Sequence, residues 1–185
     1  MKNPVKNILS LALRYGILII LGLFGIGIFY SVFSLPTIYA VFYLLKPFFV
    51  VSLSSDIIMI NENLIEIIGP CVAGSAYYLL MILNLAIPKI KIGKRIALLL
   101  FSFSSLLLLN ILRIFLLSVL FVSGFSFFDF AHKMFWYAGS TIFVAGIWFL
   151  GIKLFNIKGI PFYSDIKSLL KLRKNTKKSH SRKRH

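Results

Sequence analysis

The sequence predicts an all-α polytopic membrane protein with about four transmembrane helices, an interfacial helix on the outer side and a short extracellular β-hairpin. Of the 185 residues, 59% are hydrophobic and only 14% are charged, whereas soluble domains average about 45–50% apolar and about 25% charged residues. A chain of this length could not bury so much apolar surface in a water-soluble core. Four apolar stretches also approach the roughly 20 residues that a membrane-spanning helix needs. These observations exclude an ordinary soluble domain.

The four predicted spans follow one another along most of the chain. They are Tyr15–Ser34, Cys71–Ile87, Ile96–Val122 and Met134–Phe155. Basic residues precede the first stretch as in a signal peptide, but no small-x-small cleavage site follows, so we interpret it as an uncleaved anchor. The chain then divides into a cytoplasmic N-terminus (1–14), a membrane-embedded domain (15–157) and a basic cytoplasmic tail (158–185).

The basic residues predict the orientation of the spans. Of the 21 Lys and Arg residues, three precede Tyr15, four lie in the loop Pro88–Arg95 and eleven lie from Lys153 onward. Basic residues near span ends stay on the cytoplasmic side. Both termini are therefore expected inside, and four of the five acidic residues then fall outside.

The segment from Leu35 to Pro70 must begin and end outside if the spans alternate. We interpret residues 36–48 as a helix lying in the outer interface, because its aromatic residues suit headgroup depth. A re-entrant or spanning helix over Thr37–Leu53 is the rival interpretation. After it, the runs DIIMI and LIEII flank the turn Asn61-Glu62-Asn63. Two β-branched runs around a polar turn predict a short hairpin.

Arg113 lies within an otherwise apolar span. An arginine at the bilayer centre costs about 2.5–3.5 kcal/mol even on a lenient scale, so such a residue indicates function by default. Counted from Ile96, Arg113 lies about 26 Å from the inner surface of a hydrocarbon core about 30 Å thick, close to the outer face. Asn110 shares its helix face and can hydrogen-bond to a neighbouring helix. Alone, Arg113 is equally compatible with snorkelling toward the headgroups.

Cys71, the only cysteine of the chain, follows Gly69-Pro70 at the start of the second span. Proline suits the first helical position and glycine the cap, so we expect Cys71 in the first helical turn at the outer surface. The helix dipole and free amide groups there favour a thiolate. A lone cysteine is more commonly a buried structural residue, and the local sequence leaves both interpretations open.

His132 is expected outside, just before the fourth span begins. The other two histidines lie in the basic tail. The predicted topology therefore brings Cys71, Arg113 and His132 to one layer at the outer face. A thiol, an imidazole and a guanidinium at one depth can serve as nucleophile, base and oxyanion stabiliser.

These segments together resemble the exosortase/archaeosortase family. The resemblance rests on PCVAGSAYYLL with Cys71, NILRIFLL with Asn110 and Arg113, and His132 ahead of a glycine-bearing final span. It covers roughly Ile57 to Phe149. The segment CVAGSAYYLL is more similar to the archaeal branch than to the bacterial branch, whose cysteine is typically followed by Ser-Gly. The chain has fewer spans than many members of the family.

The resemblance implies a membrane-embedded cysteine peptidase and transpeptidase. Cys71 would be the nucleophile, His132 the base and Arg113 the third member of the site. The implied substrates are secreted proteins with a C-terminal sorting signal, made of a short motif, a transmembrane helix and a basic end. The enzyme would cleave this signal at the outer face of the cell membrane and transfer the protein to a lipid or glycan acceptor that anchors it at the cell surface.

The remaining expectations concern supporting residues and partners. Asn110, Tyr77 and Tyr78 are expected beside the site, the tyrosines as packing residues whose hydroxyls can join it. No cofactor or metal is expected, since the sequence shows no metal-ligand cluster, Gly-rich phosphate loop or carboxylate pair. The basic tail is expected to bind anionic lipid rather than nucleic acid, because it lacks interleaved aromatic residues.

Two other functions stay open at this point. A non-catalytic membrane subunit or small anion transporter would use Arg113 to bind an anion and would tolerate loss of the Cys71 thiol. An intramembrane protease that hydrolyses its substrate would use the same residues as a transpeptidase, and only the products distinguish the two.

Overall fold

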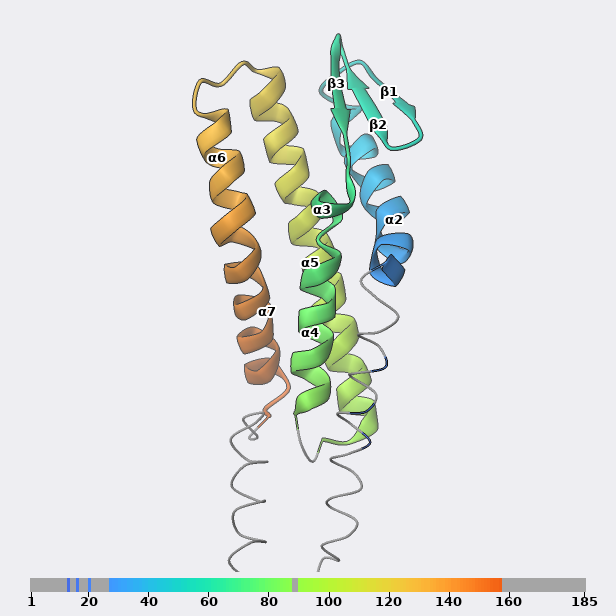
Figure 1. Ribbon diagram of the computed structural model, residues 1–185, viewed down its shortest axis with the longest axis vertical. Coiled ribbons are helices and arrows are strands. Elements are labelled where there is room, and N and C mark those ends of the chain that lie inside the picture. Colours follow the sequence, from blue (N-terminus) through green and yellow to red (C-terminus); the bar gives the residue numbers. More distant parts are fainter. Residues whose placement is uncertain (1–12, 14–15, 17–19, 21–26, 88–89, 158–185) are drawn as a thin grey trace, which may run out of the picture.

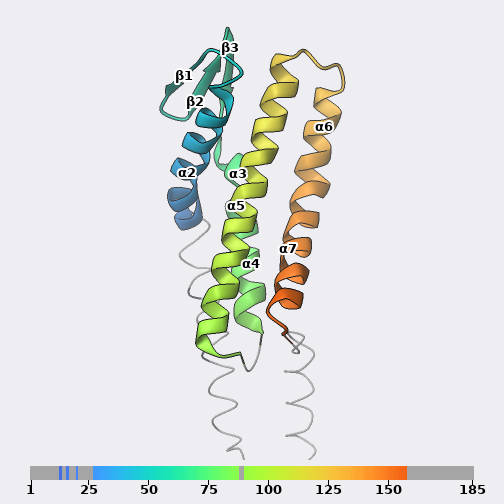
Figure 2. The ribbon, with the colours of Figure 1, turned by 180° about the vertical axis from the view of Figure 1, so that it is seen from behind.

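The computed structural model describes residues 13, 16, 20, 27–87 and 90–157. Its elements are, in chain order, α2 (Gly27–Leu45), β1 (Val51–Ser54), β2 (Ile57–Ile60), β3 (Asn63–Glu66), α3 (Gly69–Val72), α4 (Gly74–Ala86), α5 (Ile92–Val122), α6 (Phe128–Met134), the π-helical turn η1 (Phe135–Gly139) and α7 (Ser140–Leu154). The long helices lie side by side, and the small sheet lies at one end of them, which we call the sheet end (Figures 1 and 2). The described chain is thus a mostly helical bundle with an antiparallel sheet at one end.

Within the part of the chain that the structure describes, three helical segments are long and apolar enough to cross a membrane. They are α2, the pair α3–α4 and α5, and α6–η1 with α7 makes a fourth if that pair, bent by 47°, counts as one span. Figure 1 shows their alternation: α2 leads to the sheet end, α4 leads away from it, α5 returns to it, and α6 and α7 lead away again. The predicted order of the spans is therefore present in the bundle.

The prediction of an interfacial helix over residues 36–48 is wrong. Residues 27–45 form one helix, α2, which continues through Pro36. Proline has no N–H to donate to the carbonyl four residues earlier, and its ring usually kinks or ends a helix. Nearby hydroxyl groups and neighbouring helices make such a position tolerable in a membrane helix. The Thr37 hydroxyl does donate to the carbonyl of Phe33, at 2.7 Å.

Packing explains why this segment runs along the bundle. Val41 and Leu45 are fully buried in a core shared with the sheet and α5, so the helix must stand beside α5. The predicted first span, Tyr15–Ser34, overlaps α2 only over residues 27–34, and most of its remainder lies outside the described residues. The rival helix over residues 37–53 is wrong beyond Leu45, because Val51–Ser54 form β1.

The predicted hairpin is confirmed as β2 and β3, but it belongs to a larger sheet. Its loop has two residues, because Ile60 pairs directly with Asn63. Asn61 adopts a left-handed φ of 53°, as hairpin turns of this length require. The sequence did not predict strand β1. Its four residues, VSLS, are too few to give a clear alternating pattern, and its backbone hydrogen bonds are formed with β2.

Two cores hold the helices together. One lies beneath the sheet, where Ile58 and Ile60 of β2 pack with α2, α3 and α5. The other joins α4, α5 and α7 around Tyr77, whose ring stacks on Phe33 with centroids 3.8 Å apart. The boundary between these cores runs close to Cys71 and Val72, where the chain passes from the sheet into α4.

The third predicted span starts earlier than expected. The helix α5 begins at Ile92 rather than Ile96 and ends at Val122 as predicted. The guanidinium of Arg95 donates to the carbonyls of Leu85 and Ile87 at 2.9 and 2.8 Å. This arginine of the basic loop therefore also satisfies the carbonyl end of α4.

Candidate active site

A break in the helix sets the position of Cys71. The single turn α3 ends at Val72, and Ala73 adopts the left-handed conformation, with φ 59° and ψ 42°, before α4 begins. Cys71 thus lies in the first helical turn, as expected, but the helix of this span is interrupted at Ala73 rather than continuous. A four-residue helix adds little dipole, so the predicted helix-dipole effect on the thiol does not apply. The left-handed alanine costs about 1–2 kcal/mol, and such strain is typical of functional sites.

The break frees the carbonyl group of Cys71 for side chains of α5. The Cys71 N–H donates to the Ile68 carbonyl at 2.8 Å. Its own carbonyl accepts hydrogen bonds from Asn110 Nδ2 at 2.8 Å and from Arg113 Nη2 at 2.9 Å. Asn110 and Arg113 therefore hold the peptide of Cys71 in place from the neighbouring helix.

Arg113 is a buried cation whose charge no described carboxylate neutralises. Its side chain is only 8% exposed. Among the described residues its one hydrogen bond is to the Cys71 carbonyl, and its Nε has no partner. A buried charge without a partner is costly. Such a guanidinium has donors left for an anionic group that enters the site.

His132 reaches the same place from α6. It lies within the short helix Phe128–Met134. The π-helical turn η1 follows directly, a distortion frequent at functional sites. The imidazole stacks on Phe128, with centroids 5.6 Å apart, and meets Trp136 edge-on at 6.3 Å. These rings fix the orientation of an otherwise exposed side chain.

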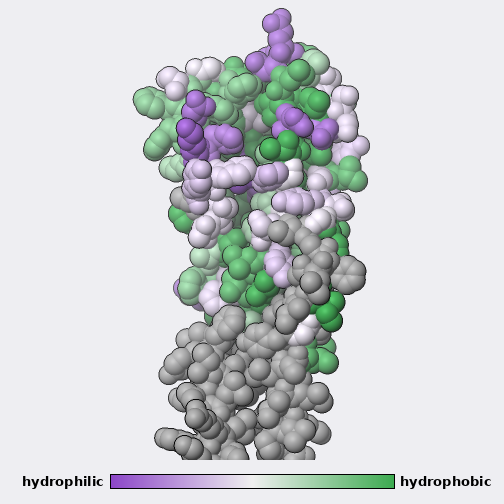
Figure 3. Space-filling view, viewed as in Figure 1, coloured by the Kyte–Doolittle hydropathy of each residue, from purple (hydrophilic) through white to green (hydrophobic). Residues whose placement is uncertain are grey.

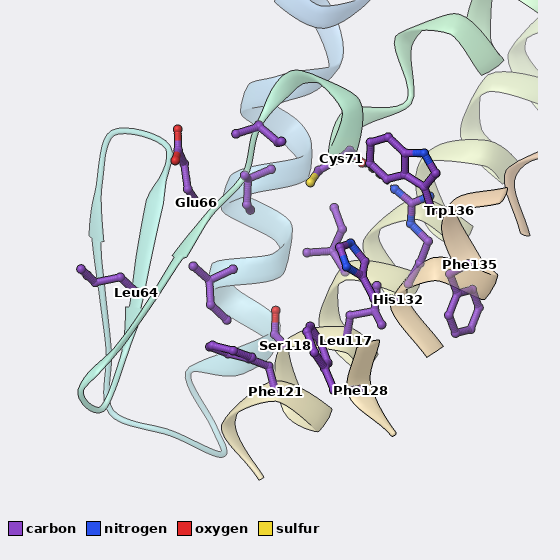
Figure 4. Close-up of a pocket in the computed structure, with 15 residues that line it drawn as sticks. Leu64, Glu66, Cys71, Leu117, Ser118, Phe121, Phe128, His132, Phe135 and Trp136 are labelled. Atoms are coloured by element: carbon purple, nitrogen blue, oxygen red, sulfur yellow. Dashed lines mark hydrogen bonds between the residues drawn. The ribbon is translucent and has the colours of Figure 1, made fainter. Parts of the chain in front are cut away.

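Cys71, Arg113 and His132 line one cavity of about 270 Å³. Its walls come from three segments: residues 64–68 with Cys71, the sheet-end half of α5, and α6 with η1. Figure 4 shows the Cys71 sulfur and the His132 ring at the same central space, between β3 and the helices. The structure therefore brings together the three residues that the sequence placed in one layer.

The other predicted supporting residues do not line the cavity. Asn110 lies behind it and acts on Cys71 through the shared carbonyl. Tyr77 is fully buried, and its hydroxyl has no partner among the described residues. Tyr78 packs near Phe29, with ring centroids 6.3 Å apart. The structure thus shows the tyrosines in packing positions, and a role for their hydroxyls stays a prediction.

Sequence reasoning missed several residues that line the cavity. They include Glu66, Ser118, Phe121, Phe128 and Trp136. Two signals could have indicated them: the spacing of Asn110, Arg113, Leu117 and Phe121, which marks one face of α5, and the spacing of four residues between Phe128, His132 and Trp136. Within residues 27–87 and 90–157, no cluster of three His, Cys, Asp or Glu side chains could hold a metal ion.

Comparisons with protein-family models, curated protein sequences and solved structures find no match to this chain. The functional argument therefore rests on the residues around the cavity.

Proposed function

We propose that this chain is a membrane-embedded cysteine transpeptidase of the exosortase/archaeosortase type, with Cys71 as nucleophile, His132 as acid and base, and Arg113 as oxyanion stabiliser. The observation that carries the proposal is the single cavity that all three residues line. They come from three separate segments of the chain.

The site lies in the half of the bundle nearer the sheet, the side on which a spanning substrate would emerge from a membrane. The three to four apolar helices support insertion, and many of the hydrophilic side chains of the face in Figure 3 gather toward the sheet end. The basic loop between α4 and α5 lies at the opposite end, so the positive-inside rule puts the sheet end outside. Both termini are then cytoplasmic, and the substrate is cut at the outer face.

The first half of the reaction makes a thioester. His132 takes the proton of the Cys71 thiol, the sulfur attacks the carbonyl carbon of the scissile peptide, and the carbonyl electron pair moves to oxygen. Arg113 donates a hydrogen bond to this oxyanion, while its Nη2 group keeps its hydrogen bond to the Cys71 carbonyl. His132 gives a proton to the leaving nitrogen, the C–N bond breaks, and the C-terminal signal departs with a new amino group.

The second half releases the protein from the enzyme. His132 takes a proton from an acceptor nucleophile, which attacks the thioester carbonyl and expels the Cys71 thiolate. An amine or hydroxyl of a lipid or glycan gives an anchored protein, whereas water gives simple hydrolysis. The partners are therefore secreted proteins with a C-terminal transmembrane signal, together with the acceptor.

The test uses a secreted protein from the same genome that ends in a transmembrane helix and basic residues, expressed together with the full chain. We expect the wild type to trim this protein, and Cys71→Ser to leave it at full length with equal enzyme in the membrane. The substitution exchanges one heavy atom for a smaller one and changes packing little, but a serine hydroxyl needs stronger activation. Normal trimming by both Cys71→Ser and Cys71→Ala would reject the proposal.

One observation favours a second function, a membrane subunit that binds an anion. Arg113 is buried and forms no ion pair with a described carboxylate, so an anionic ligand could supply the missing charge. This function predicts that Arg113→Lys keeps most of the anion binding and that the Cys71 thiol is dispensable.

A further inference from the structure

The strand β3 has an open edge toward the cavity. The strand order is β1-β2-β3, so β3 pairs with β2 on one side only. Figures 1 and 2 both show β3 as the strand nearest α5 and α6. An open strand edge presents a row of free backbone donors and acceptors to an added strand.

The register identifies which backbone groups face this edge. The Ile67 N–H donates to the Asp56 carbonyl at 2.9 Å. Because bonded and non-bonded pairs alternate along an antiparallel ladder, Ile65 also bonds to β2, whereas Leu64 and Glu66 direct their N–H and carbonyl groups away from it. No other described residue forms a backbone hydrogen bond with these outward groups.

The same edge forms one wall of the cavity that holds Cys71. Residues 64–68 line it without a gap. Along this stretch Leu64 and Ile68 are 63% and 45% exposed, and Glu66 lies exposed between them. Glu66 forms no ion pair with another described residue. The wall therefore offers backbone hydrogen bonds, two apolar contacts and one free negative charge.

We propose that the substrate peptide binds as a fourth strand along the β3 edge, held by its backbone, with a basic side chain against Glu66. This inference rests on the proposed function and adds the mode of recognition. An extended peptide is the occupant whose chemistry fits a row of unpaired amide groups, and a cation on the facing side chain is complementary to Glu66.

The proposed chemistry also sets the direction of the added strand. The substrate segment before the scissile bond comes from the outside, and its C-terminal helix enters the membrane. The strand β3 likewise leads from the sheet end down to Cys71 (Figure 1). The peptide therefore runs parallel to β3, and its C-terminal carbonyl arrives at the Cys71 sulfur.

The test measures alkylation of Cys71, the only cysteine of the chain, in the full chain in detergent micelles. The probe is acetyl-Val-Lys-Val-Thr-Val chloromethyl ketone. The sulfur bonds to the methylene carbon, chloride leaves, and the thiol proton passes to the buffer. Iodoacetamide measures the access and reactivity of the thiol without a peptide. Both alkylation rate constants are measured by intact-protein mass spectrometry. The rate constant for the chloromethyl ketone divided by that for iodoacetamide reports peptide recognition and requires no catalytic turnover.

Proline substitutions separate backbone from side-chain recognition. In Leu64→Pro and Glu66→Pro the lost N–H faces the open edge, so the ladder to β2 is kept, and proline is tolerated on edge strands. The matched controls are Leu64→Ala and Glu66→Ala, which keep the N–H. Ile65→Pro removes a bond to β2 and shows the effect of damaging the sheet.

We expect each proline variant to lower the rate ratio about five- to tenfold relative to its alanine control, with the iodoacetamide rate unchanged. Glu66→Lys should lower the ratio for the Lys probe and raise it for a probe with Glu in place of Lys. Equal ratios in the proline and alanine variants would overturn the inference and leave the cysteine chemistry intact. A dimer that dissociates in the proline variants would also overturn it, since a second copy would then occupy the edge.

Failure of the proposed function gives a different result. If iodoacetamide does not label Cys71, the thiol is not a reachable nucleophile. Fluorescence anisotropy of the same peptide as an unreactive, labelled amide then decides whether the β3 edge binds it: binding that only the proline variants lose would support the edge interaction, and equal binding by all variants would overturn it.

Discussion

At the scale of single residues, Arg113 has two tasks that the sequence could not separate. One donor holds the carbonyl of Cys71, which Asn110 also binds, and Arg113 also lines the cavity. When Arg113 is replaced, the Cys71 carbonyl still accepts the hydrogen bond from Asn110. The position of Cys71 should therefore survive the loss of the charge.

Arg113→Met should therefore abolish processing while the folded state persists, because the substitution removes a buried charge that has no carboxylate partner and is costly to keep out of water. Arg113→Lys keeps the charge but loses the planar donor fork, so we expect slower processing than in the wild type. The measurements are the trimming rate of the substrate and the melting temperature in detergent. Loss of activity in step with unfolding would show that Arg113 acts only through the structure.

At the scale of elements, the break between α3 and α4 depends on one strained residue. Ala73 has a φ of 59°, which glycine adopts without a steric penalty. Ala73→Gly should stabilise the protein by about 0.5–1 kcal/mol after the greater flexibility of the unfolded chain is counted. Ala76→Gly, within the regular part of α4, should instead destabilise it by about 1 kcal/mol. Equal losses of melting temperature in both variants would contradict the strain argument.

A buried hydrogen bond fixes α4 against α5 below the site. Asn84 Nδ2 donates to Ser102 Oγ at 2.9 Å, and both residues are fully buried. Asn84→Leu or Ser102→Ala alone leaves the other polar group without this partner. The double variant should lose less stability than the two single losses combined, with a coupling energy of about 0.6–1.7 kcal/mol. Unfolding of the four proteins in mixed micelles measures this coupling, and simple additivity would show that the bond contributes nothing.

At the scale of the whole molecule, the pattern of charge and hydropathy predicted the order of the spans and the layer of the site. It could not place the end of α2, because Pro36 normally signals a helix boundary, and the packing of this helix against α5 and the sheet is not visible in the local sequence. It also could not show the turn at Ala73, since nothing in the letters GPCVAGS marks a left-handed alanine. The contact between the Cys71 carbonyl and α5 depends on this turn, so local reasoning could not find it.

The orientation of the bundle is the property on which the proposed chemistry depends most. Glu62 in the β2–β3 loop and Lys91 before α5 are both exposed. The β2–β3 loop and the start of α5 lie at opposite ends of the bundle (Figure 1). In a Cys71→Ala background, Glu62→Cys should react with a membrane-impermeant maleimide on intact cells, and Lys91→Cys should react only after lysis. The eleven basic residues from Lys153 onward make the reverse orientation unfavourable, because basic segments near spans stay inside. Labelling of Lys91→Cys but not Glu62→Cys on intact cells would put Cys71 on the cytoplasmic side, where a secreted substrate could not meet it.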